Sequence, residues 1–123
     1  NMAGLLATGA PEIRSDGLWN NFGQCCGDAS IGDYALFLHR ATGNPEYLDL
    51  ARRVAEVIAD ASTVEDGKRS WLQAEHRDRP DFVETQTGYM QGAAGIGSFM
   101  LHLATNDADV VAKIPLPDVP FTY

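Results

Sequence analysis

The residues of this chain best suited to chemistry are two adjacent cysteines, Cys25 and Cys26, in a glycine-flanked turn. Adjacent Cα atoms across a trans peptide lie ~3.8 Å apart, which is shorter than the ~4.4–6.8 Å usual for a disulfide. We therefore expect free thiols or metal ligands. Two thiols are half of a typical zinc set, and catalytic zinc needs three protein ligands with one open position. On spacing alone, a pair of small buried apolar side chains is the simpler interpretation.

Three histidines are candidates for a third ligand or a general base, because histidine serves in both roles. His39 and His102 lie within apolar helical patterns, which is typical of hydrogen-bonded core or edge histidines, and His76 lies in a charged loop. Asp28 and Asp33 flank the start of a helical pattern, where carboxylates are stabilised by the helix N-terminus. These side chains therefore have structural explanations, and no catalytic residue is assigned.

The turn that holds the cysteines recurs 65 positions later (Gly27 to Gly92) without a gap. Seven pairs match in this frame: Gly23/Gly88, Gly27/Gly92, Ile31/Ile96, Gly32/Gly97, Tyr34/Phe99, Leu36/Leu101 and Leu38/Leu103. Met90 and Gln91 occupy the cysteine positions of the second copy, which predicts a structural repeat without ligands. The repeat also explains the glycines of residues 92–97, which superficially resemble a phosphate-binding loop but follow no predicted strand.

Apolar periodicity and capping residues predict helices at about residues 29–42, 45–62 and 93–105. Ser30 and Asp33 fit a capping box at the first helix, and Asn44 fits the cap of the second, with a proline in its first turn. The first and third helices are apolar on several sides, which indicates burial, whereas the second is amphipathic and should lie outside them. The repeating unit is therefore a glycine turn, an inner helix and an outer helix.

The rest of the chain is less regular. Residues 3–8 read as the tail of a helix, residues 63–86 as a long polar loop anchored by Trp71, and the proline-rich tail 113–123 as extended. We expect a single domain over residues 1–123, all-α, with glycine-turn repeats at 22–62 and 87–105. Because such units stack and at least three are normally needed, one and a half repeats indicate a piece of something larger.

Composition excludes several classes of function. The net charge is −8, and the nine Lys and Arg residues are scattered singly, whereas nucleic acids and anionic membranes require clustered basic side chains. No apolar run approaches the ~20 residues of a membrane-spanning helix. We find no secretory signal and take the first residues, Asn1 to Ala3, for a tag remnant. Unsecreted cysteines are expected to stay reduced, so the predicted location is cytoplasmic.

Four segments together resemble the lanthionine synthetase C-like (LanC-like) family of peptide cyclases: residues 24–32, 42–51, 90–97 and 116–121. The resemblance implies an α/α toroid of inner and outer helices around a zinc site, here a partial toroid. It also implies that Cys25 and Cys26, followed by Gly27, are zinc ligands, as in members that carry Cys-Cys-Gly. The family's upstream cysteine and its catalytic His and Asp have no counterparts in this chain, which would correspond to the C-terminal part of a cyclase.

The implied reaction is the addition of a cysteine thiol of a precursor peptide to a dehydrated Ser or Thr, as in lantibiotic biosynthesis. Zinc makes the incoming thiol a thiolate near neutral pH, which is its reactive form. This chain is expected to be inactive alone. The second hypothesis is a non-catalytic helical-repeat interaction module. Under either hypothesis the open inner-helix faces should promote self-association, because large apolar patches rarely stay exposed.

Overall fold

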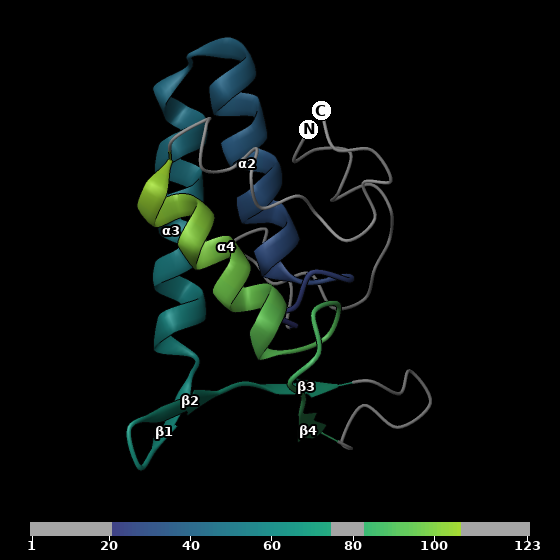
Figure 1. The fold of residues 1–123 in the computed structure, drawn as a ribbon. Coiled ribbons are helices and arrows are strands. Elements are labelled where there is room, and N and C mark those ends of the chain that lie inside the picture. The colour runs from purple at the N-terminus through teal and green to yellow at the C-terminus, as the bar shows by residue number, and fades with distance from the viewer. Residues whose placement is uncertain (1–20, 75–82, 107–123) are drawn as a thin grey trace.

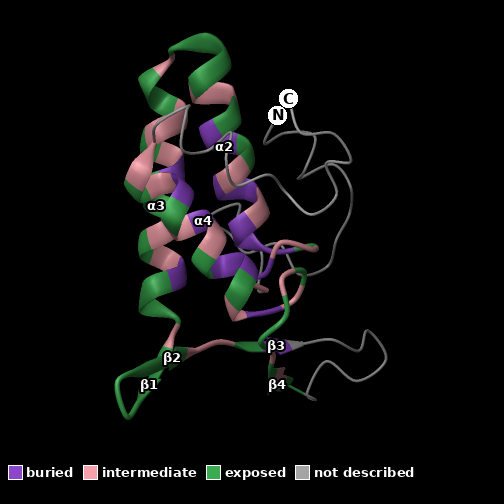
Figure 2. Ribbon diagram, viewed as in Figure 1, coloured by how far each residue is buried: buried purple, intermediate pink, exposed green. Residues whose placement is uncertain are grey.

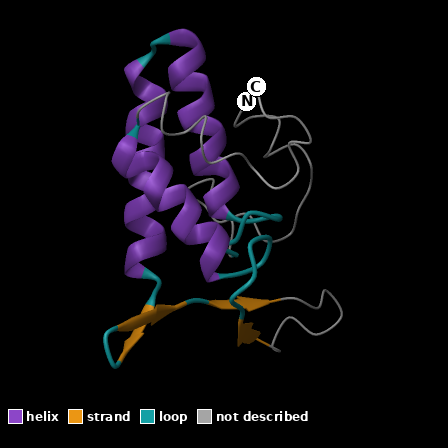
Figure 3. Ribbon diagram, viewed as in Figure 1, coloured by secondary structure: helices purple, strands orange, loops and turns teal. Residues whose placement is uncertain are grey.

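The computed structural model describes residues 21–74 and 83–106, which form three helices and two small antiparallel sheets (Figures 1 and 3). The elements are α2 (Asp28–Thr42), α3 (Pro45–Asp60), β1 (Thr63–Glu65), β2 (Lys68–Ser70), β3 (Leu72–Ala74), β4 (Val83–Thr85) and α4 (Ala93–Thr105). The described part is thus mainly helical, as predicted. The predictions for residues 3–8, His76 and the tail 113–123 lie outside the described residues.

α2 and α3 form a helical hairpin whose connection follows the prediction. Gly43 ends α2 with a left-handed φ of 72°, and its N–H donates to the carbonyl of His39 at 2.7 Å. The side chain of Asn44 then accepts from the N–H of Glu46 at 3.0 Å and caps α3, which has its proline in the first turn. The second helix ends at Asp60, slightly before the predicted residue 62. Local capping chemistry therefore determines this hairpin.

The core lies where α4 packs on the α2–α3 hairpin (Figures 1 and 2). α3 is amphipathic and buries one face, as predicted for an outer helix, with Val54 and Ile58 fully buried. α4 contributes Ile96 and Phe99, which are also fully buried. None of the helices within residues 21–74 and 83–106 is long and apolar enough to cross a membrane.

The predicted capping box at the start of α2 is wrong. The N-cap is Gly27, in an extended conformation and without a side-chain cap, so Ser30 lies too far into the helix for that role. The Ser30 hydroxyl instead donates back to the carbonyl of Gly27 at 2.7 Å. Asp33 turns its carboxylate toward Gln24 and His102. The glycine turn therefore begins this helix through its backbone alone.

The predicted long loop contains two β-hairpin pairings. β1 pairs with β2 and β3 pairs with β4, both antiparallel. The turn between β1 and β2 is Asp66-Gly67, both with positive φ, which is the signature of a two-residue hairpin turn. Trp71 is the packing anchor that was predicted, since its indole N–H donates to the carbonyl of Ile58 at 2.7 Å. The β1–β2 hairpin thus continues from the lower end of α3, and Trp71 ties the chain that follows it to that helix (Figure 1).

Candidate functional site

The two glycine turns that precede α2 and α4 share two backbone hydrogen bonds. In each turn the first two N–H groups of the following helix donate to carbonyls seven residues earlier. The bonds are Asp28 to Asn21 (3.0 Å), Ala29 to Phe22 (3.2 Å), Ala93 to Gln86 (2.9 Å) and Ala94 to Thr87 (3.2 Å). Each bond of the first turn lies 65 positions before its counterpart. The sequence repeat is therefore also a repeat of local structure.

The first turn lies directly on the second. The N–H of Cys25 donates to the carbonyl of Met90 at 2.7 Å. A Cβ atom at Gly23 would lie 2.7 Å from the same carbonyl oxygen, so only glycine allows this approach. Gly27 is required for a second reason, because its Cβ would lie 2.5 Å from the backbone of Gly23. These contacts fix the backbone that carries the two cysteines.

Both cysteines are free thiols, with Cys25 partly buried and Cys26 exposed. Their Sγ atoms lie 3.6 Å apart. Two sulfur ligands at the usual Zn–S distance of ~2.3 Å and tetrahedral geometry are separated by about 3.8 Å. The separation of the two Sγ atoms is therefore already close to that of two sulfur ligands of one tetrahedral zinc ion. Cys26 adopts a left-handed φ of 57°, a conformation that costs a non-glycine residue roughly 1–2 kcal/mol.

The neighbouring thiol changes the acidity of Cys25. The hydrogen bond with Cys26 raises the pKa of the Cys25 thiol above its ordinary value of 9.0, and burial and the charge of Cys26 raise it further. The metal-free Cys25 thiol is therefore protonated near neutral pH. Because metal ligands must be thiolates, a metal ion that binds Cys25 displaces that proton, and its affinity rises with pH.

The other candidate ligands lie elsewhere. Within residues 21–74 and 83–106, no three or more His, Cys, Asp or Glu side chains gather to hold a metal ion. His39 bonds through Nδ1 to the carbonyl of Asn44 at 3.0 Å, near the far end of α2. His102 is buried against Asp33. The described residues thus fit zinc in the spacing of two sulfur ligands and supply no third.

A buried polar bridge connects the cysteine turn to both inner helices, and sequence reasoning missed it. Gln24 donates through Nε2 to Oδ2 of Asp33 at 2.6 Å and to the carbonyl of Gly95 at 3.2 Å. Oδ1 of Asp33 lies 2.8 Å from Nδ1 of His102, and both side chains are largely buried. Since Gln24 directly precedes Cys25, this bridge holds the turn in place. Its members are 9 and 69 positions apart, so no local pattern identifies them.

Comparison with known proteins gives one family match. The family model described as lanthionine synthetase C-like protein matches residues 7–116. This range includes both glycine turns and every described helix and strand. No curated protein and no solved structure gives a match.

Proposed function

The chain belongs to the lanthionine synthetase C-like family, and we propose that Cys25 and Cys26 are two thiolate ligands of zinc in a peptide cyclase. The observation that carries this proposal is the spacing of the two Sγ atoms, 3.6 Å apart at the tip of the turn before α2. Such a spacing suits one tetrahedral ion bound by both sulfurs. The exposure of Cys26 supports access of a substrate to that ion. Reduced thiols also favour a cytoplasmic setting.

The proposed reaction adds the thiol of a cysteine in a precursor peptide to the double bond of a dehydrated Ser or Thr. The sulfur bonds to the β carbon and a proton is delivered to the α carbon, so a thioether forms and nothing leaves or is oxidised. Zinc, when bound, lowers the pKa of the substrate thiol so that it is a thiolate near neutral pH. The role of this chain is then to hold the ion and keep it accessible.

The residues around the thiols support that role by fixing the turn. The bond from Cys25 to the carbonyl of Met90 anchors its backbone on the second turn. Gln24 anchors it on Asp33 and Gly95. Catalytic zinc needs a third protein ligand, which none of the described side chains supplies. We therefore propose that the chain acts as the C-terminal part of a cyclase and is inactive alone.

Zinc content tests the proposal, with the repeat as a built-in control. Protein purified without chelator is analysed for metals as the wild type, as Cys25→Ala/Cys26→Ala and as Met90→Ala/Gln91→Ala. The second double variant changes the equivalent positions of the other turn. Because the two thiolates would hold zinc without the third ligand, each protein is first equilibrated with excess zinc and then freed of unbound metal; we expect zinc in the wild type and in the Met90/Gln91 variant, and its loss from the cysteine variant. Zinc that is absent from the wild type, or retained without the cysteines, would refute the proposal and favour a non-catalytic interaction module.

A further inference from the structure

The cysteine turn is anchored at two neighbouring residues, and the two anchors differ in kind. The side-chain amide of Gln24 donates to Asp33 of α2 at 2.6 Å and to the carbonyl of Gly95 in α4 at 3.2 Å. The backbone N–H of Cys25 donates to the carbonyl of Met90 at 2.7 Å. The bond of Cys25 joins backbone atoms and does not depend on residue type. The anchor at Gln24 depends on its side chain.

The hydrogen-bond partners of Gln24 require a donor at this position. Asp33 accepts from Gln24 through Oδ2, while its Oδ1 lies 2.8 Å from Nδ1 of His102. The second partner, the backbone oxygen of Gly95, is also an acceptor. An amide N–H₂ has two hydrogens to donate, one for each partner, whereas an ionised carboxylate at position 24 would have none. The surroundings therefore favour glutamine over glutamate, although the two have the same shape.

The stem of the Gln24 side chain also packs closely against α4. A Cβ atom at Gly95 would lie 2.7 Å from Cγ of Gln24, and it would overlap the carbonyl oxygen of Tyr89 as well. The missing side chain of Gly95 thus leaves the room that the stem of Gln24 occupies. Gln24 is therefore held by α4 at its stem as well as at its tip.

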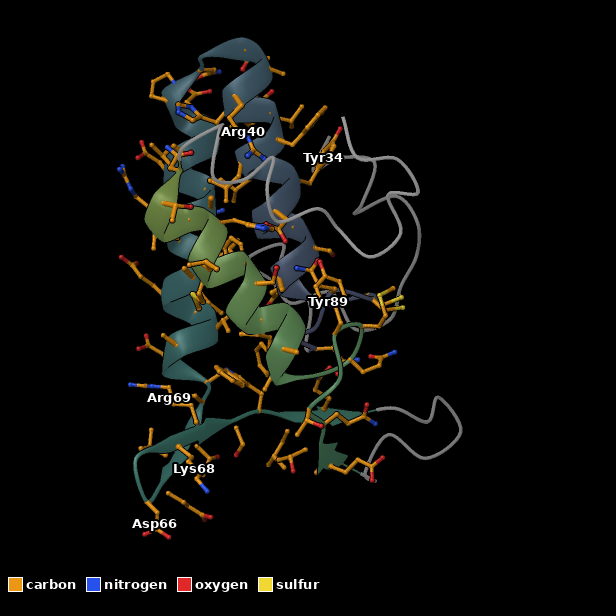
Figure 4. The ribbon with its side chains drawn as sticks, in the orientation of Figure 1. Tyr34, Arg40, Asp66, Lys68, Arg69 and Tyr89 are labelled. Carbon is orange, nitrogen blue, oxygen red and sulfur yellow. The ribbon has the colours of Figure 1, made fainter. Side chains whose placement is uncertain are left out.

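The second turn forms the two shared backbone bonds with other residues at these positions. Tyr89, which lies in the turn that leads into α4 (Figure 4), is the counterpart of Gln24, and Ser98 is the counterpart of Asp33. The backbone frame therefore does not require the pair of a glutamine and an aspartate. The pair occurs in the copy of the repeat that carries the thiols.

Backbone strain is another difference between the two turns. Cys26 has a φ of 57°, whereas its counterpart Gln91 is not among the non-glycine residues of the described ranges that have positive φ. Such a conformation persists only where the surrounding structure maintains it. Because the side chain of Cys26 is exposed, the constraint comes from the neighbouring residues of the turn. In this constrained backbone the Sγ atoms of Cys25 and Cys26 lie 3.6 Å apart.

We propose that Gln24 is a positioning residue for the thiol pair. Through Asp33 and Gly95 it keeps the turn at the Sγ spacing that suits a single atom bound by both sulfurs, and so raises the affinity of the pair for such an atom. The inference rests on the proposed function for the identity of that atom, zinc. A preorganised pair binds more tightly because it loses less conformational freedom on binding. Loss of residues that orient metal ligands typically lowers metal affinity about 10–100-fold.

Zinc affinity, measured by competition with a chromophoric chelator, tests this role. Gln24→Met keeps the length of the side chain and removes both hydrogen bonds, so it should lower the affinity at least ~10-fold. Gln24→Glu should lower it as well, because two carboxylates then face each other. Adding Asp33→Asn to Gln24→Glu restores a donor and an acceptor in the opposite direction and the original net charge. The affinity should then recover in part, since the bond to Gly95 stays lost.

A destabilising variant outside the bridge is the matched control. Val54→Ala leaves a cavity beneath α3, where Val54 is fully buried, and should lower the free energy of unfolding. Its zinc affinity should equal that of the wild type, because it changes no residue of the turn or the bridge. All affinities are measured where circular dichroism shows that each variant keeps its helices. A loss confined to the Gln24 variants therefore reports positioning rather than stability.

A second probe separates this inference from the proposed zinc site. Phenylarsine oxide reacts with two neighbouring thiols, forms two As–S bonds and releases water, and it needs no zinc. The Gln24 variants should bind it more weakly, in the same order as they bind zinc. If the wild type binds the arsenical but no zinc, the zinc site is refuted and the arsenical affinities alone decide the positioning role. The role would be overturned by a wild type that binds neither probe, by Gln24→Met that binds like the wild type, or by equal loss in Val54→Ala.

Discussion

The turn before α2 and the turn before α4 share a backbone frame and differ in what their side chains offer. Both place an extended glycine at the helix N-cap, with φ of −143° at Gly27 and −137° at Gly92. Between the glycines, the first turn carries two thiols and the second carries Met90 and Gln91. The thiol turn also has a strained residue, Cys26, in a left-handed conformation. Strain of this kind is typical of functional sites, where the surrounding structure maintains it.

The helices that follow the turns differ in a second way. α4 buries Phe99 on α2, whereas α2 exposes the equivalent Tyr34. Equivalent residues of a repeat therefore have different environments, because burial depends on the neighbouring unit. The backbone frame of the repeat is therefore set by local sequence, whereas packing and side-chain chemistry differ between the two copies. Pairs of substitutions at equivalent positions test this conclusion.

The largest difference is expected for the equivalent aromatics. Phe99→Ala should lower the free energy of unfolding by about 3–5 kcal/mol, because it removes a fully buried ring and leaves a cavity. Tyr34→Ala should change it by less than ~1 kcal/mol, because half of that side chain is already exposed. Urea denaturation at low protein concentration measures both. Equal costs would show that the two helices are equally packed.

The equivalent glycines should respond with opposite signs. Gly32→Ala should destabilise by roughly 1–3 kcal/mol, because its Cβ overlaps the Phe99 ring and overpacking must displace it. Gly97→Ala should stabilise by up to ~1 kcal/mol, because alanine is the better helix former and its Cβ meets nothing. The same denaturation experiment distinguishes them. Destabilisation by Gly97→Ala would contradict the open space around Gly97.

The polar bridge exists in one copy of the repeat only. Asp33→Asn should cost roughly 1–2 kcal/mol, because the new amide N–H₂ faces a donor of Gln24 or of His102. Ser98→Ala, at the equivalent position of α4, should change stability by no more than ~0.5 kcal/mol. Thermal unfolding of both variants provides the measurement. If Asp33→Asn left the stability unchanged, the polar bridge would not be a support of the cysteine turn.

The smallest predicted change is in the acidity of Cys25. Cys26→Ala removes the hydrogen bond that contributes most to raising the pKa of the Cys25 thiol. That pKa should therefore fall toward 9.0, so that more thiolate is present at a given pH and iodoacetamide reacts faster with Cys25. The rate is measured against pH on metal-free protein, with Gln91→Ala as the control that should leave it unchanged. A pKa that stays the same in Cys26→Ala would contradict the coupling of the two thiols.

Local patterns predicted much of the fold. Residues 93–105 form α4 as predicted, and Gly43 and Asn44 end one helix and cap the next because each acts on its own backbone. The β1–β2 hairpin was missed although Asp66-Gly67 signals it, because its short, exposed strands show no apolar alternation. The exposure of Tyr34 could not be predicted either, since the apolar pattern of a helix does not show which of its faces other elements cover.

The candidate site was predicted only in part. The adjacency of Cys25 and Cys26 identified two thiols, but not their spacing or the left-handed backbone of Cys26. Asp33 was assigned to a helix cap and instead joins Gln24 to His102. These are long-range contacts, and a sequence gives no direct information on which side chains meet across a packed core.

The difference between the two turns is tested most directly by X-ray absorption at the zinc edge, which counts the sulfur atoms around bound zinc. In zinc-loaded wild type, and in Met90→Ala/Gln91→Ala, we predict sulfur neighbours at about 2.3 Å, contributed by Cys25 and Cys26. These neighbours should be absent from Cys25→Ala/Cys26→Ala. Zinc held by nitrogen and oxygen alone in the wild type would contradict the assignment of the cysteine turn as the metal-binding copy of the repeat.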